Sequence, residues 1–145
     1  MMKINEFIKK YRCVKEYANS SEVEDFYGEM KISRNPHVIC KDGFKMSVQV
    51  GQSLYSSPKD VADKYEQAEI GFPSIPESLI TKYAEDGEVE GDDDSRLCDT
   101  VYPYVPVELI DEVISKHGGI DEDAVWGSMT ENQRAESGTH TIIER

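Results

Sequence analysis

The chain has 145 residues, of which 38% are hydrophobic, and this length and composition suit one folded domain with a single core. It carries 16 basic and 29 acidic residues, which gives a net charge of −13. A field of this sign repels nucleic acid and anionic membranes, so the composition argues against direct binding to either. The partners that it favours are basic protein surfaces.

The charge is unevenly distributed along the chain. Residues 1–50 hold nine basic and seven acidic groups, a net of +2, whereas residues 51–145 hold seven basic and 22 acidic groups, a net of −15. The three cysteines are widely spaced and form no Cys-x-x-Cys motif, which predicts free thiols in a reducing cytoplasm. No apolar run approaches the roughly 20 residues of a membrane span, and no signal peptide is recognised.

The first part of the chain carries helical signals. Apolar residues recur at three- and four-residue steps through residues 3–18, which predicts an amphipathic helix there. Ser21 and Glu24 have the spacing of a capping box, so a short second helix is expected around residues 22–30.

The clearest local signal is a β-hairpin at Asp42-Gly43. An apolar run at residues 37–40 precedes this turn pair, and residues 44–50 alternate between apolar and polar side chains. Residues 52–63 have loop composition. Residues 65–72 then predict a third strand with one buried face.

A helix is expected over residues 75–84, because Ser74 offers an N-cap and Glu77 follows three residues later. An acidic loop follows at residues 85–96.

A fourth strand is predicted over residues 100–105. Pro103 lies inside it and indicates an edge strand or a bulge, because proline cannot donate to a central ladder. The strongest helix of the chain begins after Pro106 and ends at Gly118-Gly119, which is the usual placement of proline and glycine around a helix.

This order of elements predicts an α+β fold, with an antiparallel sheet of about four strands and helices packed on one face. Residues 1–120 are expected to form a single domain, and residues 121–145 a C-terminal segment that is partly packed or flexible. Residues 130–145 are expected to form a polar tail. Three apolar residues near the start of that segment are expected to pack back on the domain: Ile120, Val125 and Trp126.

The acidic loop is the first candidate functional feature, since seven of the ten residues from 85 to 94 are acidic. An EF-hand site is not expected, because Leu97 stands where that loop needs its last carboxylate. A row of carboxylates can instead occupy a groove that binds phosphates. A solvated loop without a partner is the alternative. The candidate partner-binding residues are Asp86, Glu88, Glu90, Asp92, Asp93 and Asp94.

Tyrosines are the second candidate feature. Tyr102 and Tyr104 are two positions apart on a predicted strand and should therefore share a face. Aromatic rings on a sheet can stack a nucleotide base, with Lys45 or Lys64 nearby to bind its phosphate. The alternative is packing at the edge of the core.

Catalytic and metal motifs are not found, so a non-enzymatic protein without a cofactor is expected. None of the three histidines has a second histidine or a cysteine at metal-ligand spacing. His37 and Cys40 are three residues apart on a strand and should point to opposite faces. His117 is interpreted as a partner of a helix dipole.

Residues 69–74, 101–110 and 116–120 resemble small uncharacterised proteins from phages and prophages of Gram-positive bacteria. The resemblance covers residues 37–120. It implies a mobile-element accessory protein of the bacterial cytoplasm that inhibits a host defence protein, in the manner of an anti-CRISPR. Its acidic residues would bind a basic, nucleic-acid-handling enzyme. The alternative that it implies is a protein that binds or sequesters a nucleotide signal.

Overall fold

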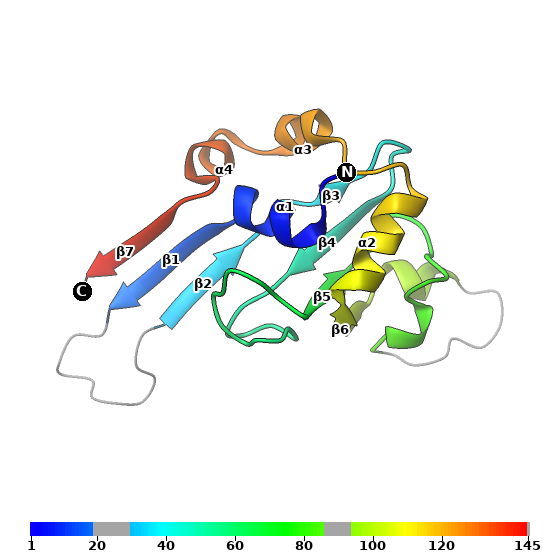
Figure 1. Ribbon diagram of the computed structural model, residues 1–145, viewed down its shortest axis with the longest axis horizontal. Helices are drawn as coiled ribbons and strands as arrows, with labels where there is room; N and C mark the ends of the chain where they lie inside the picture. The colour runs from blue at the N-terminus through cyan, green and yellow to red at the C-terminus, as the bar shows by residue number, and fades with distance from the viewer. Residues whose placement is uncertain (19–29, 86–93, 145) are drawn as a thin grey trace.

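The computed structural model of the protein describes residues 1–18, 30–85 and 94–144. Its strands form two sheets that lie next to one another along the long axis of the molecule (Figure 1). The strands are β1 (Cys13–Ala18), β2 (Met30–Arg34), β3 (Val38–Ile39), β4 (Lys45–Gln49), β5 (Gln67–Gly71), β6 (Val101–Pro106) and β7 (His140–Glu144). The helices are α1 (Ile4–Tyr11), α2 (Val107–Lys116), α3 (Glu122–Ser128) and α4 (Glu131–Glu136), with the short 3-10 helices η1 (Thr81–Tyr83) and η2 (Asp94–Cys98).

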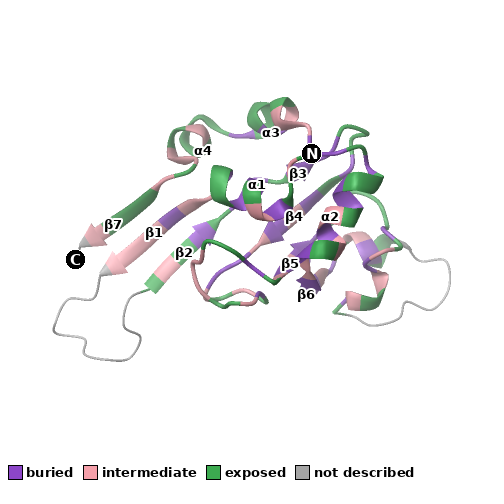
Figure 2. Ribbon diagram, viewed as in Figure 1, coloured by how far each residue is buried: buried purple, intermediate pink, exposed green. Residues whose placement is uncertain are grey.

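The larger sheet has the strand order β3-β4-β5-β6 and is antiparallel throughout, which confirms the predicted α+β class and its four-stranded antiparallel sheet. Its inner face buries Met46, Val48, Ile70 and Tyr102 against α1 and α2. Figure 2 shows this buried centre in the larger sheet, with exposed residues on the helices, the loops and β7. Burial of this apolar surface is the main stabilising contribution to the fold.

The predicted hairpin is present, with β3 and β4 joined at Asp42-Gly43. Gly43 has a φ of +95°, a conformation that glycine adopts without steric cost. Its N–H donates to the carbonyl of Cys40 at 2.9 Å. The predicted third strand is also present as β5.

Both expectations for the chain around Pro103 are confirmed. Strand β6 lies at the edge of the four-stranded sheet, and its register with β5 shifts between Ala68 and Ile70. Pro106 then caps α2, and Gly118 and Gly119 end it with φ values of +90° and +93°.

The predicted helix over residues 3–18 is correct only in its first half. Helix α1 ends at Tyr11, and Arg12 turns the backbone to an extended conformation with φ −65° and ψ 145°. Strand β1 follows and pairs antiparallel with β2 and parallel with β7. Pairing on both sides satisfies the backbone of β1 and overrides a helical pattern that ran on through Val14. The helix expected at residues 22–30 falls outside the described residues, apart from Met30 in β2.

The predicted helix over residues 75–84 is wrong, because only the one-turn η1 forms there. The Ser74 hydroxyl does not cap a helix and accepts the N–H of Lys45 at 2.9 Å instead. The carboxylate of Glu77 turns inward, where it accepts the N–H of Leu79 at 2.8 Å and contacts His117. These tertiary contacts replace the expected capping box.

The polar tail predicted over residues 130–145 is also wrong. Thr130 and Gln133 form a capping box that starts α4, and β7 then pairs with β1. Of the three apolar residues expected to pack back, Ile120 and Val125 are buried at 7% and 0% exposure, whereas Trp126 is 46% exposed.

Candidate ligand-binding site

A cavity of about 870 Å³ lies beside the three-stranded sheet. Its walls come from β1, β2 with the two residues after it, the end of β4 with the segment that follows to residue 54, and α4 with Met129. Tyr11 at the end of α1 also lines it. A volume of this size is within the range that small-molecule sites occupy in proteins.

The strand pairing explains why these residues line the cavity. Cys13, Lys15 and Tyr17 follow one another at two-residue steps and so share one face of β1. The register places Arg34 opposite Cys13 and Ile32 opposite Lys15, which brings both onto that same face. Helix α4 approaches this face, since the Cys13 Sγ lies 3.4 Å from Glu136 Oε2.

The lining of the cavity is basic, although the chain is strongly acidic. It holds three cations, Lys15, Lys31 and Arg34, and one carboxylate, Glu136. Lys15 Nζ lies 3.6 Å from Glu136 Oε1, and Lys31 Nζ lies 3.9 Å from Asp60 Oδ1. Arg34 is exposed and forms no ion pair with the described part of the chain. Its guanidinium is therefore available to an anion.

Two buried oxygens belong to residues that line the cavity, and neither has a hydrogen-bond donor among the described residues. They are Ser33 Oγ and Asn35 Oδ1, in residues that are 7% and 9% exposed. The orientation of Asn35 is fixed, because its Nδ2 donates to the carbonyl of Val48 at 2.8 Å and its N–H donates to Gln49 Oε1 at 3.0 Å. A buried acceptor without a donor costs about 1–3 kcal/mol. Ser33 pairs with Val14 and so points to the other face of the strand pair from Cys13 and Arg34.

The thiol of Cys13 acts as a hydrogen-bond donor in this site. Burial raises its pKa, and the hydrogen bond to the Glu136 carboxylate raises it further. The thiol therefore stays protonated at neutral pH and is a poor nucleophile.

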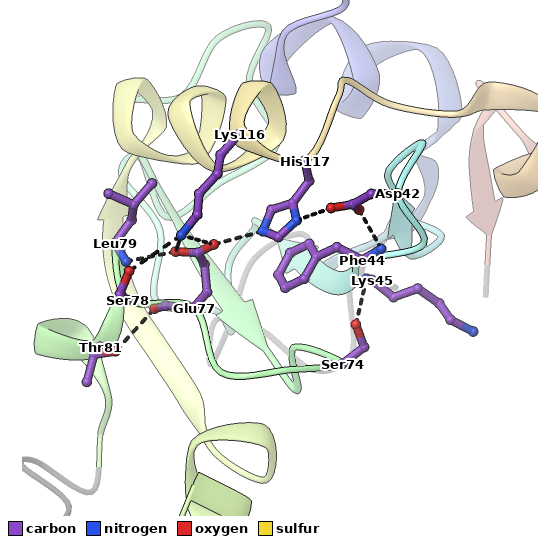
Figure 3. A network of polar contacts seen from close by, with 10 residues as sticks. All are labelled: Asp42, Phe44, Lys45, Ser74, Glu77, Ser78, Leu79, Thr81, Lys116 and His117. Atoms are coloured by element: carbon purple, nitrogen blue, oxygen red, sulfur yellow. Dashed lines mark hydrogen bonds and ion pairs between the residues drawn. The ribbon is translucent and has the colours of Figure 1, made fainter.

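A second polar cluster lies at the end of α2 and is drawn in Figure 3. His117 lies between two carboxylates, with Nδ1 2.6 Å from Asp42 Oδ2 and Nε2 2.7 Å from Glu77 Oε1. The ring of Phe44 stacks on the imidazole, with centroids 4.1 Å apart and planes 10° apart. Lys116 Nζ lies 2.9 Å from Glu77 as well.

This cluster joins three segments that are far apart in the sequence. Burial opposes ionisation of Glu77, which is 2% exposed, but hydrogen bonds from Leu79, Lys116 and His117 outweigh it and lower the pKa of that carboxyl. The Phe44 N–H, followed by His117, lowers the pKa of Asp42. Each ring nitrogen of His117 therefore lies within hydrogen-bond distance of a carboxylate oxygen, and the imidazole is held from both sides. The interpretation of His117 as a helix-dipole partner missed both carboxylates.

The nearby thiol gives this cluster no nucleophile. Cys40 is 1% exposed, and burial, with a smaller effect of Asp42, raises its pKa to about 11. The described residues also contain no group of three or more His, Cys, Asp or Glu side chains placed to hold a metal ion. We interpret the His117 cluster as a structural connection between α2, the β3–β4 turn and the segment around Glu77.

The predicted nucleotide platform is not formed as expected, because Tyr102 and Tyr104 do not share a face. Tyr102 is fully buried, its hydroxyl donates to the Leu97 carbonyl at 2.5 Å, and burial raises its pKa to about 12. Tyr104 is 37% exposed and has a φ of +54°. The register shift in β6 breaks the two-residue alternation on which the prediction depended.

Tyr104 instead pairs with a tyrosine from the loop after β4. Its ring centroid lies 5.7 Å from that of Tyr55, and Lys59 Nζ lies 5.8 Å and 5.4 Å from the two rings respectively. Lys45 and Lys64, the bases predicted to accompany the tyrosines, are not in this cluster.

The predicted partner-binding acids lie almost entirely outside the described residues. These are Asp86, Glu88, Glu90, Asp92 and Asp93, while Asp94 begins η2. Their role stays a prediction.

Sequence reasoning missed the cavity because it assigned its β1 wall to a helix. The alternation of Cys13, Lys15 and Tyr17 with Val14 and Glu16 was the available signal, and it competed with an apolar three- and four-residue pattern over the same segment.

Comparisons with protein-family models, with curated proteins and with solved structures find no match to this chain. Among the described residues, no helix has the length and apolar character needed to cross a membrane. Fold and site together define an α+β protein with a basic-lined cavity between a small mixed sheet and a short helix.

Proposed function

We propose that this protein binds a small anionic ligand in the cavity beside β1 and β2. The observation that carries the proposal is the reversal of charge, since three cations and one carboxylate line the cavity of a chain with a net charge of −13. An acidic surface repels free anions, so a basic lining is a specific feature and not an average property of the chain.

The chemistry of the lining favours a nucleotide-sized ligand. The exposed guanidinium of Arg34 suits a phosphate, which arginine binds through paired N–H groups. Tyr11 and Tyr17 add aromatic surface to the lining, on which a base can stack. The proposed role is binding or sequestration, and the thiol of Cys13, whose pKa is raised by burial, is a poor nucleophile.

Thermal unfolding with a panel of mono-, di-, tri- and cyclic nucleotides, followed by calorimetric titration of the best ligand, tests the proposal. A ligand that binds only the folded state raises the Tm. Loss of a charged hydrogen bond is worth about 1.5–3 kcal/mol, so Arg34→Ala should weaken binding at least about tenfold.

Arg96→Ala is the matched control, because Arg96 is an exposed arginine in η2 and does not line the cavity. It should bind the ligand as the wild type does. No rise in Tm across the panel, or equal weakening by both substitutions, would contradict the proposal.

A second candidate function follows from the net negative charge of the sequence. We propose, from the net of −15 over residues 51–145 and the resemblance to phage and prophage proteins, that the acidic surface inhibits a basic host defence enzyme in the bacterial cytoplasm. Within the described residues Cys13, Cys40 and Cys98 form no disulfide, which is consistent with that reducing compartment.

A further inference from the structure

Strand β7 is an edge strand of the smaller sheet. The order β2-β1-β7 leaves β7 with β1 as its one strand neighbour within the described residues, and Figure 1 shows it on the side away from the four-stranded sheet. Alternate backbone N–H and C=O groups of an edge strand point outward without a ladder partner. Such groups pair readily with another strand.

The residues of β7 do not protect this edge. Natural edge strands are commonly blocked by proline, lysine or a bulge, and the five residues of β7 include none of these. The centre of the strand is Thr141, Ile142 and Ile143, and β-branched residues favour strand pairing. Ile142 is 63% exposed, a high value for an isoleucine in a sheet.

The sequence of β7 is complementary to itself in an antiparallel arrangement. If two copies pair around Ile142, then His140 of each stands opposite Glu144 of the other, and Thr141 stands opposite Ile143. Contacts between β-branched residues directly across a strand pair are stabilising, so the Thr141–Ile143 pairs favour this arrangement. The ring of His140 is already engaged within its own chain, with Nε2 2.7 Å from Glu16 Oε2. The same pairing occurs twice about a two-fold axis, which is the requirement for a symmetric dimer.

We propose that β7 pairs antiparallel with β7 of a second copy of this chain. The two three-stranded sheets then become one continuous sheet in the order β2-β1-β7-β7-β1-β2. The exposed side chains of Ile142 meet at the two-fold axis. This interface does not rest on the proposed ligand, because the cavity residues of β1 lie one strand further inside.

The small area of this contact predicts a weak dimer. Five paired residues bury far less surface than the roughly 1,200–2,000 Å² of a stable complex, so the dimer should dissociate on dilution. The negative charge of each copy opposes association further.

Sedimentation velocity over a micromolar to millimolar concentration series tests the proposal on the full chain. The wild type should shift from monomer to dimer as its concentration rises, and the β7 amides should gain protection from hydrogen exchange over the same range. Ile142→Lys should remain monomeric, because it places two ammonium groups together at the two-fold axis.

Ile75→Lys is the control, since Ile75 is 53% exposed and lies outside both sheets. It should dimerise like the wild type. Circular dichroism verifies that each variant is folded. A monomer at every concentration, a dimer that survives Ile142→Lys, or β7 amides whose exchange does not change with concentration overturns the proposal.

Discussion

His117 shows how much a single residue depends on its surroundings. By its position at the end of α2 it is a partner for the helix dipole, but in the folded chain it is 7% exposed and lies between Asp42 and Glu77. These carboxylates come from segments 75 and 40 residues away. Their hydrogen bonds, together with the stacked ring of Phe44, fix the imidazole in one orientation.

Stability should therefore fall in acid through this cluster. The folded-state pKa values of Asp42 and Glu77 are lowered, so their contribution is present above the ordinary carboxyl pKa of about 4 and is lost as the pH falls through the folded values. Burial raises the pKa values of Asp111 and Glu69, which acts in the opposite direction.

A substitution isolates the part that Asp42 contributes. The Tm of Asp42→Asn should decrease less than that of the wild type between neutral pH and pH ~3, because the variant lacks one carboxyl with a lowered pKa. Asp63→Asn should keep the wild-type profile, since that side chain is 86% exposed. Parallel profiles for Asp42→Asn and the wild type would show that this interaction does not govern the acid response.

At the scale of elements, the turn between α4 and β7 positions the C-terminal strand beside β1. Gly138 has a φ of +74°, and its N–H donates to the carbonyl of Arg12 at 2.9 Å. A Cβ added there would lie 3.0 Å from the carbonyl oxygen of Lys10. The close approach of this turn to the end of α1 therefore favours glycine.

Gly138→Ala should lower the free energy of unfolding by about 1–2 kcal/mol, because the side chain disfavours the left-handed conformation and contacts backbone. Gly127→Ala is the matched control. Gly127 lies inside α3 with no heavy atom within 4 Å of an added Cβ, so alanine there should be neutral or stabilising by up to about 1 kcal/mol. Urea denaturation measures both, and equal values for the two variants would refute the role of this turn.

At the scale of the whole molecule, the two proposed activities require binding partners of opposite charge. The cavity is basic, whereas the sequence as a whole is acidic, with seven acids among residues 85–94. The ligand of the cavity should be a small anion, because three cations line the cavity. A macromolecular partner bound through the acidic surface should itself be basic, and its binding should weaken with salt.

Affinity capture of the tagged chain from a bacterial lysate at low salt measures the second activity. A basic, nucleic-acid-handling protein should be retained and then released as the salt concentration rises. Replacement of Asp92, Asp93 and Asp94 by asparagine should reduce its capture, while Arg34→Ala should not. Capture that is insensitive to both salt and the triple substitution would eliminate the acidic surface as the binding site.

Local signals in the sequence determined a substantial part of this protein. The turn pair Asp42-Gly43 and the alternation after it specify the hairpin, and Pro106 and Gly118 bound α2, because these residues act through their own backbone conformations. Pro103 likewise indicated an edge strand, since a missing N–H is a property of the residue itself.

Only the tertiary structure decided the smaller sheet and the sites that depend on it. The pairing of Val14 with His140 joins residues 126 positions apart, and neither segment alone can satisfy its backbone as a strand. That pairing ended α1 at Tyr11, converted a predicted polar tail into β7, and formed the basic wall of the cavity. Contacts between segments that are far apart in the sequence stabilise these elements, and local sequence patterns do not predict such contacts.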